Sequence, residues 1–341
     1  MFRKIIGIST AKGFSFSQPR NYATKSIGTH NGLFHCDEAL AVYLLRQTKE
    51  FKEAQLVRSR DPNLLSKCDV LVDVGGEFDP DRLRFDHHQK DFSESFIGGD
   101  IKLSSAGLVY KYFGKEIIKN SLSQSLNQTD SESLDLIYKK LYNVFVRPID
   151  AIDNGIPSTS GGILYTDCTG ITHRVRRLNP QWYEKKSEAM ELEQFEKASV
   201  LVGQEFHQHL DEIMMSWIPS RQLVQKAFQN RFKHHKSGKM IVLDTFCPWS
   251  DHLSVIDTNN VLYVIYPATE HDWRVQCVKK RGSLFESRHP LPRRWRGLST
   301  ERLRQITNLE TAMFVHASGF IGGCKNYSDA MKMAEMALKT A

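Results

Sequence analysis

The chain has 341 residues and six cysteines, and 40% of its residues are hydrophobic and 25% charged. This length suits two domains better than one, and the composition excludes a globally disordered chain. No stretch approaches the ~20 consecutive apolar residues that a membrane-spanning helix needs, so we expect no membrane partner. The cysteines are too widely spaced for a disulfide framework or a structural zinc site.

The N-terminal segment combines basic, hydroxyl and small apolar residues, and the first acidic residue of the chain is Asp37. This composition is typical of a mitochondrial transit peptide, although a simple basic tail is the alternative. We therefore expect residues 1–22 to be a transit peptide and the mature protein to lie in the mitochondrial matrix. Their removal takes away four basic residues and lowers the formal net charge from +7 to +3.

Strand-like and helix-like segments alternate in the first part of the chain. We expect strands at 26–30, 54–60, 69–75 and 82–88, and helices at 38–46, from Ser104 or Ser105 to 113, and from Leu134 to a stop before Pro148. The polar stretch 119–133 predicts an insertion loop. Alternating elements of this kind predict an α/β fold with a mostly parallel sheet and flanking helices.

The second part opens with a long helical pattern over 181–235, broken at Pro219. Strands at 239–244, 261–266 and 273–278, helices at 299–308 and 326–340, and a glycine-bearing turn at 319–323 follow. We therefore divide the chain into a metal-binding catalytic domain (27–178), a helical connector (179–236) and a smaller C-terminal α/β domain that binds substrate (237–341).

Four groups of polar residues follow expected strands or helices of the first domain. In open α/β sheets such groups meet at the carboxyl ends of the strands, although they lie far apart in sequence. Mixed imidazole and carboxylate ligands suit Mn²⁺, Fe²⁺, Zn²⁺ or Co²⁺, and this set is large enough for two ions with Asp73 as their bridge. The candidate residues are His30, His35 and Asp37; Asp73; Asp86, His87 and His88; and Asp150 and Asp153.

Single members of this set have structural alternatives. His30 can be a strand-end histidine bonded to backbone, and Asp37 can be a helix N-cap. Asp73 follows an apolar strand, where a carboxylate needs partners. Adjacent His87 and His88 would point to opposite faces of a strand, so one can bind metal while the other meets substrate.

Five motifs carry a resemblance to a known family: HNGLFHCDEALA (30–41), VDVGGEFD (72–79), RFDHHQ (84–89), IDAIDNG (149–155) and FVHASGFIGG (314–323). In this order they resemble the melanocyte-proliferating-gene family, an uncharacterised group numbered UPF0160 and a branch of the DHH phosphoesterases. The resemblance runs from about Ile27 to the C-terminus, with the polar insertion as an interruption.

The resemblance implies a two-lobed enzyme with two Mn²⁺ ions and 3′-to-5′ exonuclease activity on RNA, in mitochondria and in the nucleus or nucleolus. By position, His30 and His35 would hold one ion, Asp37, His87 and Asp150 the other, and Asp73 would bridge. His88 would face the scissile phosphate, and Asp86 would orient a histidine. The substrate-binding residues of the second lobe would be Arg293, Arg294, His316, Gly322, Gly323 and Lys325.

The sequence departs from the wider DHH pattern at three places. His35 stands one residue later than the usual middle ligand of the first motif, and Asp150 and Asp153 compete for the fourth motif. The glycine pair is followed by Cys324 and Lys325, where many relatives have histidine. Substrate recognition is therefore less defined by the sequence than metal binding.

Three functions remain open from the sequence. The first is a metal-dependent phosphodiesterase on RNA 3′ ends, favoured by the run 279–296, which mixes seven basic residues with Phe285 and Trp295 and one acidic residue. The second is a phosphohydrolase of the same superfamily that acts on pyrophosphate or short oligonucleotides. The third is a non-catalytic RNA-binding or metal-sensing protein that retains the outline of the site.

Overall fold

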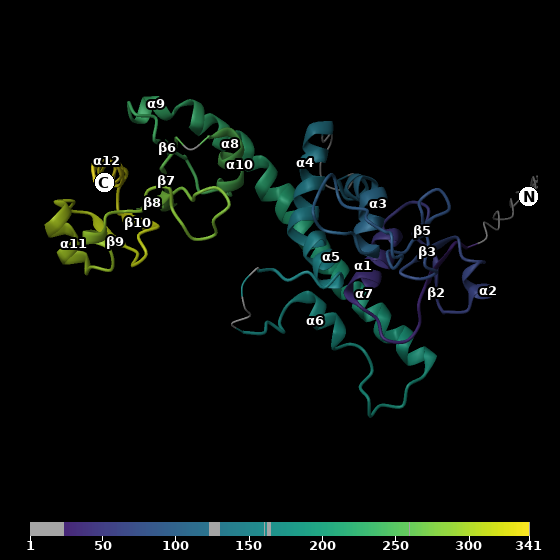
Figure 1. Ribbon diagram of the computed structural model, residues 1–341. Coiled ribbons are helices and arrows are strands. Elements are labelled where there is room, and N and C mark those ends of the chain that lie inside the picture. The colour runs from purple at the N-terminus through teal and green to yellow at the C-terminus, as the bar shows by residue number, and fades with distance from the viewer. Residues whose placement is uncertain (1–23, 123–129, 160, 162–164, 259, 341) are drawn as a thin grey trace, which may run out of the picture. The chain divides into compact units, whose positions relative to one another are not determined.

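A computed structural model describes residues 24–122, 130–159, 161, 165–258 and 260–340. The chain folds into two compact units, which are formed by the elements labelled in Figure 1. The unit boundaries fall at Phe113, Ile149 and Ser199. The first unit comprises the described residues up to Phe113 together with Asp150–Ser199, and the second comprises Gly114–Ile149 and the described residues from Val200 onward. The expected connector, 179–236, is therefore divided between the two units. The expected transit peptide, 1–22, lies outside the described residues.

The first unit is built on a sheet with the strand order β2-β1-β3-β5-β4. β1, β2, β3 and β5 run parallel, whereas β4 pairs antiparallel with β5 at the edge, so the expected mostly parallel α/β fold is confirmed. The strands are β1 (Ser26–Thr29), β2 (Gln55–Arg58), β3 (Val70–Val72), β4 (Phe78–Asp79) and β5 (Arg84–Phe85).

The apolar spacing of the first long helix explains how the unit forms its core. Helix α1 buries Leu40, Leu44 and Leu45, and the side chains of β3 next to it in the fold are buried as well. A strand that is buried along its length is expected in a parallel sheet with helices on its faces. The helices that contribute to this unit are α1 (Cys36–Arg46), α2 (Pro62–Leu65), α3 (Ser105–Leu122), α5 (Arg147–Asp153), α6 (Ile171–Arg176) and α7 (Glu188–Glu212).

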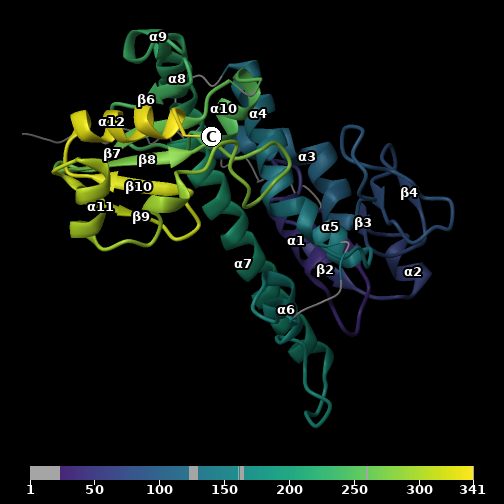
Figure 2. The same cartoon turned by 60° about the vertical axis from the view of Figure 1, so that its left-hand side comes forward.

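The second unit contains a sheet with the order β6-β7-β8-β10-β9, in which only β6 and β7 pair in parallel. Helix α12 runs along this sheet (Figure 2), and its apolar side chains share one core with α11. The elements are α4 (Ser131–Leu141), α8 (Ile218–Gln229), α9 (Arg231–His234), β6 (Met240–Val242), α10 (Ser250–Ile256), β7 (Tyr263–Thr269), β8 (Asp272–Cys277), α11 (Thr300–Thr307), β9 (Ala312–Val315), β10 (Ile321–Cys324) and α12 (Tyr327–Leu338).

Two prolines that were expected to end helices instead lie inside continuous helical segments. Pro148 is the second residue of α5, and Pro219 is the second residue of α8. Each follows a π-helical turn, η1 (Tyr142–Val146) or η2 (Ile213–Trp217). A proline inside a continuous helix removes one backbone hydrogen bond, and in each segment the π-helical turn before the proline is where the hydrogen-bond pattern departs from that of an α-helix.

Two loop predictions also need correction. Helix α3 extends to Leu122 and α4 begins at Ser131, so the expected insertion loop 119–133 is too long at both ends; residues 123–129 lie outside the described part. The expected glycine-bearing turn at 319–323 is a turn only in its first part, because strand β10 starts at Ile321. Its pairing with both β8 and β9 satisfies the backbone groups of a segment that is poor in side chains.

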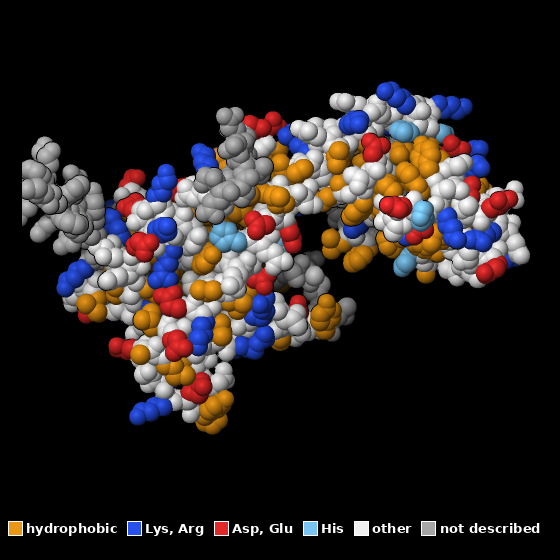
Figure 3. Space-filling view, turned by 180° about the vertical axis from the view of Figure 1, so that it is seen from behind, with side chains coloured by type: hydrophobic (Ala, Val, Ile, Leu, Met, Phe, Trp, Pro, Cys, Tyr) orange, Lys and Arg blue, Asp and Glu red, His pale blue; other side chains and the backbone are white. Residues whose placement is uncertain are grey.

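On the face shown in Figure 3, Lys and Arg side chains are interspersed with Asp and Glu side chains. Within the described residues, no helix combines the length and the apolar character needed to span a bilayer.

Candidate metal centre

The candidate ligands of the first unit gather where its parallel strands end. His30 follows β1, Asp73 follows β3, and Asp86 to His88 follow β5, whereas Asp37 lies in the first turn of α1. Because β1, β3 and β5 are parallel neighbours, their carboxyl ends lie at one edge of the sheet. Motifs that are far apart in the sequence thus form a single cluster in the fold.

Asp73 is the centre of this cluster. It is buried, and its backbone adopts a left-handed conformation with φ of 56°, which aspartate tolerates better than most residues. Its Oδ2 lies 3.3 Å from His30 Nε2, and its Oδ1 lies 3.4 Å from His87 Nε2. Burial opposes ionisation of Asp73, but its bonds with these two histidines outweigh burial and hold its pKa below the usual value.

The two buried histidines are held in a strongly acidic surrounding. Burial alone lowers the pKa of His30, but Asp73 and Glu38 raise it to about 10. Burial lowers the pKa of His87 as well, and Asp153 and Asp73 raise it to about 9. The raised pKa values favour protonated imidazoles, so a cation that binds to these ring nitrogens must displace protons.

Asp37 lacks such compensation. It is buried, and neither of its carboxylate oxygens has a partner in hydrogen-bonding geometry among the described residues. Burial, followed by the charges of Asp73 and Asp153, raises its pKa well above the usual value. An unpaired buried carboxylate is costly, so this part of the site is fitted to a cation.

The described residues contain three groups of donor atoms that could hold a metal ion, each with atoms within 4.8 Å of one another. Asp73 belongs to two of the groups, and His35 also belongs to two. A shared carboxylate is the arrangement that two neighbouring ions require. The groups are His30, His35, Glu38 and Asp73; Asp73, His87 and His88; and His35, Asp37 and Asp153.

The structure brings Asp153, rather than Asp150, to these donor atoms. Asp153 Oδ2 lies 3.1 Å from His87 Nε2. Asp150 belongs to none of the three groups formed by the described residues. Its Oδ1 instead accepts hydrogen bonds from the backbone N–H and the hydroxyl of Ser104, at 3.0 and 2.7 Å, just before α3 begins. One helical turn therefore separates a carboxylate that faces the metal ligands from one that fixes the start of a helix.

His88 and Asp86 form a pair beside the cluster. The His88 side chain is 63% exposed, and its Nδ1 lies 2.7 Å from Asp86 Oδ1. The other oxygen of Asp86 accepts the N–H of Gly76 at 2.7 Å. Asp86 thus fixes the His88 ring while leaving Nε2 for another group.

A cavity of about 780 Å³ opens at this edge, lined by His30, His35, Asp73, Asp86 and His88. Arg60, which follows β2, is exposed and is the only Lys or Arg among the described residues that line it. Glu38 is fully buried against the same cluster, and its Oε1 accepts the His35 N–H at 2.8 Å. Arg60 and Glu38 were not identified as site residues from the sequence. Glu38 could have been found, because it is an acidic residue on the apolar side of a predicted helix.

The expected substrate-binding residues of the second unit differ in their exposure. Arg293 and Arg294 lie in a short 3₁₀ turn, η3 (Arg293–Trp295), and are exposed, as are His316 and Lys325. Gly322 and Gly323 are buried in β10. Of the aromatics in the basic run, Trp295 is fully buried and only Phe285 is free to stack.

The chain is thus an α/β protein with a buried His/Asp cluster that could hold metal ions at the carboxyl ends of parallel strands. The family model described as "Uncharacterised protein family (UPF0160)" matches residues 26–338, and the chain belongs to this family. The chain is 44% identical to the rat protein named MYG1 exonuclease over 337 residues, which cover 94% of this chain and 87% of that protein. The human MYG1 exonuclease is 43% identical with 94% and 88% coverage, and the Dictyostelium discoideum MYG1 protein is 42% identical with 91% and 95% coverage.

The different settings of the two aspartates of α5 lead to opposite expectations. Asp153→Asn should weaken binding of a divalent cation at least roughly tenfold, because it removes a charge beside His87, with little effect on stability. Asp150→Ala should lower the free energy of unfolding by about 1–3 kcal/mol, because the buried Ser104 N–H loses its acceptor. Isothermal titration with Mn²⁺ and urea unfolding of both variants measure these effects. If Asp150→Ala abolished metal binding in a protein of unchanged stability, the assignment would be reversed.

Proposed function

We propose that the protein is a Mn²⁺-dependent phosphodiesterase of the DHH type that removes nucleotides from the 3′ ends of single-stranded RNA. The observation that carries this proposal is the buried acidic cluster centred on Asp73, with two groups of donor atoms that share this carboxylate. The mammalian relatives named exonucleases support hydrolysis of a nucleic acid. Mixed His and Asp donors suit Mn²⁺ better than Ca²⁺ or Mg²⁺.

Residues of all three groups would hold the ions. His30, His35 and Asp73 would bind one, and Asp37, His87 and Asp153 would contribute to the other, with Asp73 shared. When bound, such ions polarise phosphoryl oxygens and lower the pKa of water.

The chain's own groups position the substrate. Arg60 supplies a cation to the cavity, where it can bind a phosphate oxygen. His88 presents Nε2 to the cavity, because Asp86 holds its Nδ1. This nitrogen can contact the scissile phosphate and exchange a proton with the leaving oxygen.

The first test is hydrolysis by residues 23–341 with added Mn²⁺ on a 5′-labelled single-stranded RNA and, in parallel, on pyrophosphate. We expect a ladder that shortens from the 3′ end, and a loss of more than ~100-fold in His87→Ala/His88→Ala, since both a ligand and a proton-transfer group are removed. Circular dichroism of the double variant checks that it is folded. Phosphate release without a ladder would favour the small-molecule phosphohydrolase, and unchanged turnover in the double variant would exclude the site.

The exposed arginines of η3 are proposed to contact the RNA backbone together with His316 and Lys325. Reversal of charge in Arg293→Glu/Arg294→Glu should weaken RNA binding and reduce the steepness of its salt dependence, because fewer counterions are released. Fluorescence anisotropy at several salt concentrations measures both effects. An unchanged salt slope would remove these residues from the interface.

We further propose that the protein acts in the mitochondrial matrix, with a second pool in the nucleus or nucleolus. The acid-free composition of residues 1–22 supports import, and an inefficient signal is compatible with two locations. A C-terminal fluorescent fusion should reach mitochondria, and deletion of residues 2–22 should abolish this. Mitochondrial signal that survives the deletion would contradict the proposal.

A further inference from the structure

The sheet of the second unit has two unlike faces. Side chains such as Val242, Ile265 and Val275 point to a core that includes Leu303 of α11 and Met333 of α12. On the opposite face, β6 and β7 are covered by apolar side chains of α8 and α10. On this opposite face, β8, β10 and β9 present the partly exposed side chains of Asp272, Arg274, Gln276, Ile321 and Phe314. The Asp272 carboxylate lies 3.7 Å from the Arg274 guanidinium.

Aromatic rings lie at both ends of this partly exposed face. Phe246 follows β6 and is 59% exposed, although it is a large apolar side chain. Its ring centroid lies 5.0 Å from that of Tyr266, whose hydroxyl donates to Gln276 Oε1 at 2.6 Å. This bond fixes the Gln276 amide beside the exposed ring.

The second ring is Phe314 of β9. The guanidinium of Arg274 lies 5.4 Å from its ring centroid, a cation–π distance. Both side chains lie over Gly323, where a Cβ would come within 2.7 Å of the ring and 3.1 Å of the guanidinium. Glycine at 323 is therefore what allows the ring and the cation to lie close to the sheet.

A cavity of about 260 Å³ adjoins Phe246 and is also lined by Gln276 and Lys279. This is slightly smaller than cavities that hold drug-sized ligands, and it combines an apolar wall, an amide and a cation. Asp251 also lines it, but its carboxylate already accepts hydrogen bonds from Lys140 at 2.6 Å and Trp217 Nε1 at 3.2 Å. The negative charge of Asp251 is thus compensated within the unit.

We propose that this face is a stacking surface for single-stranded RNA, with one base in the cavity against Phe246 and another against Phe314 and Arg274. Lys279 and the exposed Arg281 would contact the phosphates. Flat rings interleaved with cations suit a polyanion that carries flat bases, and such surfaces bind with little sequence preference. The identity of the ligand as RNA rests on the proposed function, whereas the stacking residues are additional to Arg293 and Arg294.

The test compares two oligomers of equal length and charge, a single-stranded RNA and its abasic counterpart, by anisotropy in EDTA so that no turnover occurs. Phe246→Leu and Phe314→Leu should each weaken binding of the RNA roughly 5- to 150-fold and leave binding of the abasic oligomer unchanged. Phe246→Tyr should retain binding, since it keeps a ring. Lys279→Gln should weaken binding of both oligomers equally.

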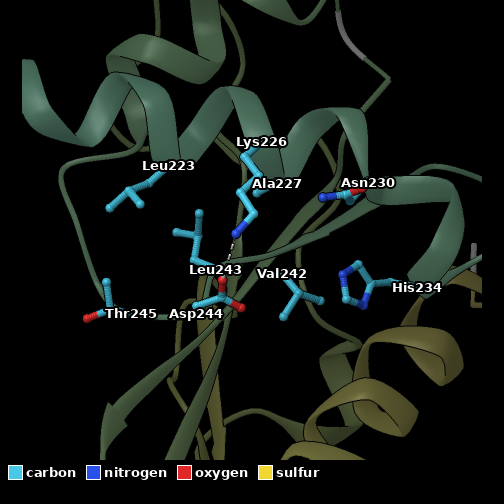
Figure 4. Close-up of a pocket in the computed structure, with 9 residues that line it drawn as sticks. All are labelled: Leu223, Lys226, Ala227, Asn230, His234, Val242, Leu243, Asp244 and Thr245. Carbon is cyan, nitrogen blue, oxygen red and sulfur yellow. Dashed lines mark ion pairs between the residues drawn. The ribbon is translucent and has the colours of Figure 1, made fainter.

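Matched controls exist in the same unit. Phe232 of α9 is 58% exposed, so Phe232→Leu removes an equally exposed ring away from the proposed surface. Lys226 of α8 points toward Asp244 at 3.8 Å in a separate hollow (Figure 4), so Lys226→Gln matches the charge change of Lys279→Gln. Neither control should alter the preference for RNA over the abasic oligomer.

Two results would overturn the stacking surface. The first is equal affinity of the wild-type protein for both oligomers, which would indicate a site for negative charge alone, such as a site for an acidic peptide. The second is a loss of RNA affinity in Phe246→Leu that is no larger than the loss in Phe232→Leu. The proposed hydrolysis is read separately on the same preparation with Mn²⁺. If binding depended on the bases but the RNA were not shortened, the stacking surface would be supported and only the proposed exonuclease activity would be contradicted.

Discussion

The structure of the first unit depends on the burial of several carboxylates around one point. Asp37, Glu38 and Asp73 are all buried, and removing such groups from water costs several kcal/mol each unless positive charge compensates them. The raised pKa values of His30 and His87 favour their protonated forms, which supply part of this compensation. Neither oxygen of Asp37 has a hydrogen-bond partner in the described part of the chain, so this part of the site can accept a further cation.

Several contacts outside the ligand set hold these groups in place. Ser105 at the start of α3 donates to Asp73 Oδ1 at 3.1 Å, while its neighbour Ser104 is held by Asp150. A buried Asn179 bonds both the N–H and the C=O of Phe34, at 2.9 and 2.8 Å, and so fixes the loop between His30 and His35. Ligands on a loop keep their geometry only when such contacts support them.

Arg58 adds a second support to this loop. Its Nη2 donates to the carbonyl of Gly32 at 2.8 Å, and its guanidinium lies over the rings of Phe34 and Phe195. The end of β2 is thereby joined to the segment after β1. The strand order therefore brings the ligands to one edge, and polar contacts from β2, α3 and the segment before α7 define their positions.

The sequence allowed the parallel sheet and the identity of the clustered residues to be predicted, because strand ends are marked by an abrupt change from apolar to polar residues. It could not separate Asp150 from Asp153, since that choice depends on which face of α5 meets Ser104. Nor could it show that α8 continues through Pro219, because a π-helical turn is set by packing rather than by local pattern. The role of Glu38 could not be predicted either, because its burial against the His30 and Asp73 side chains depends on how α1 packs.

The glycine pair of β10 shows how one strand can meet two demands. Successive residues of a strand face opposite sides of the sheet. A Cβ at Gly322 would come within 2.9 Å of Met333 Sδ and 3.0 Å of Leu291, on the side of the α11 and α12 core. A Cβ at Gly323 would instead displace Phe314 and Arg274 on the opposite face. The first glycine is thus required by close packing of the core and the second by the surface that we propose for RNA, so a single motif can carry both stability and recognition.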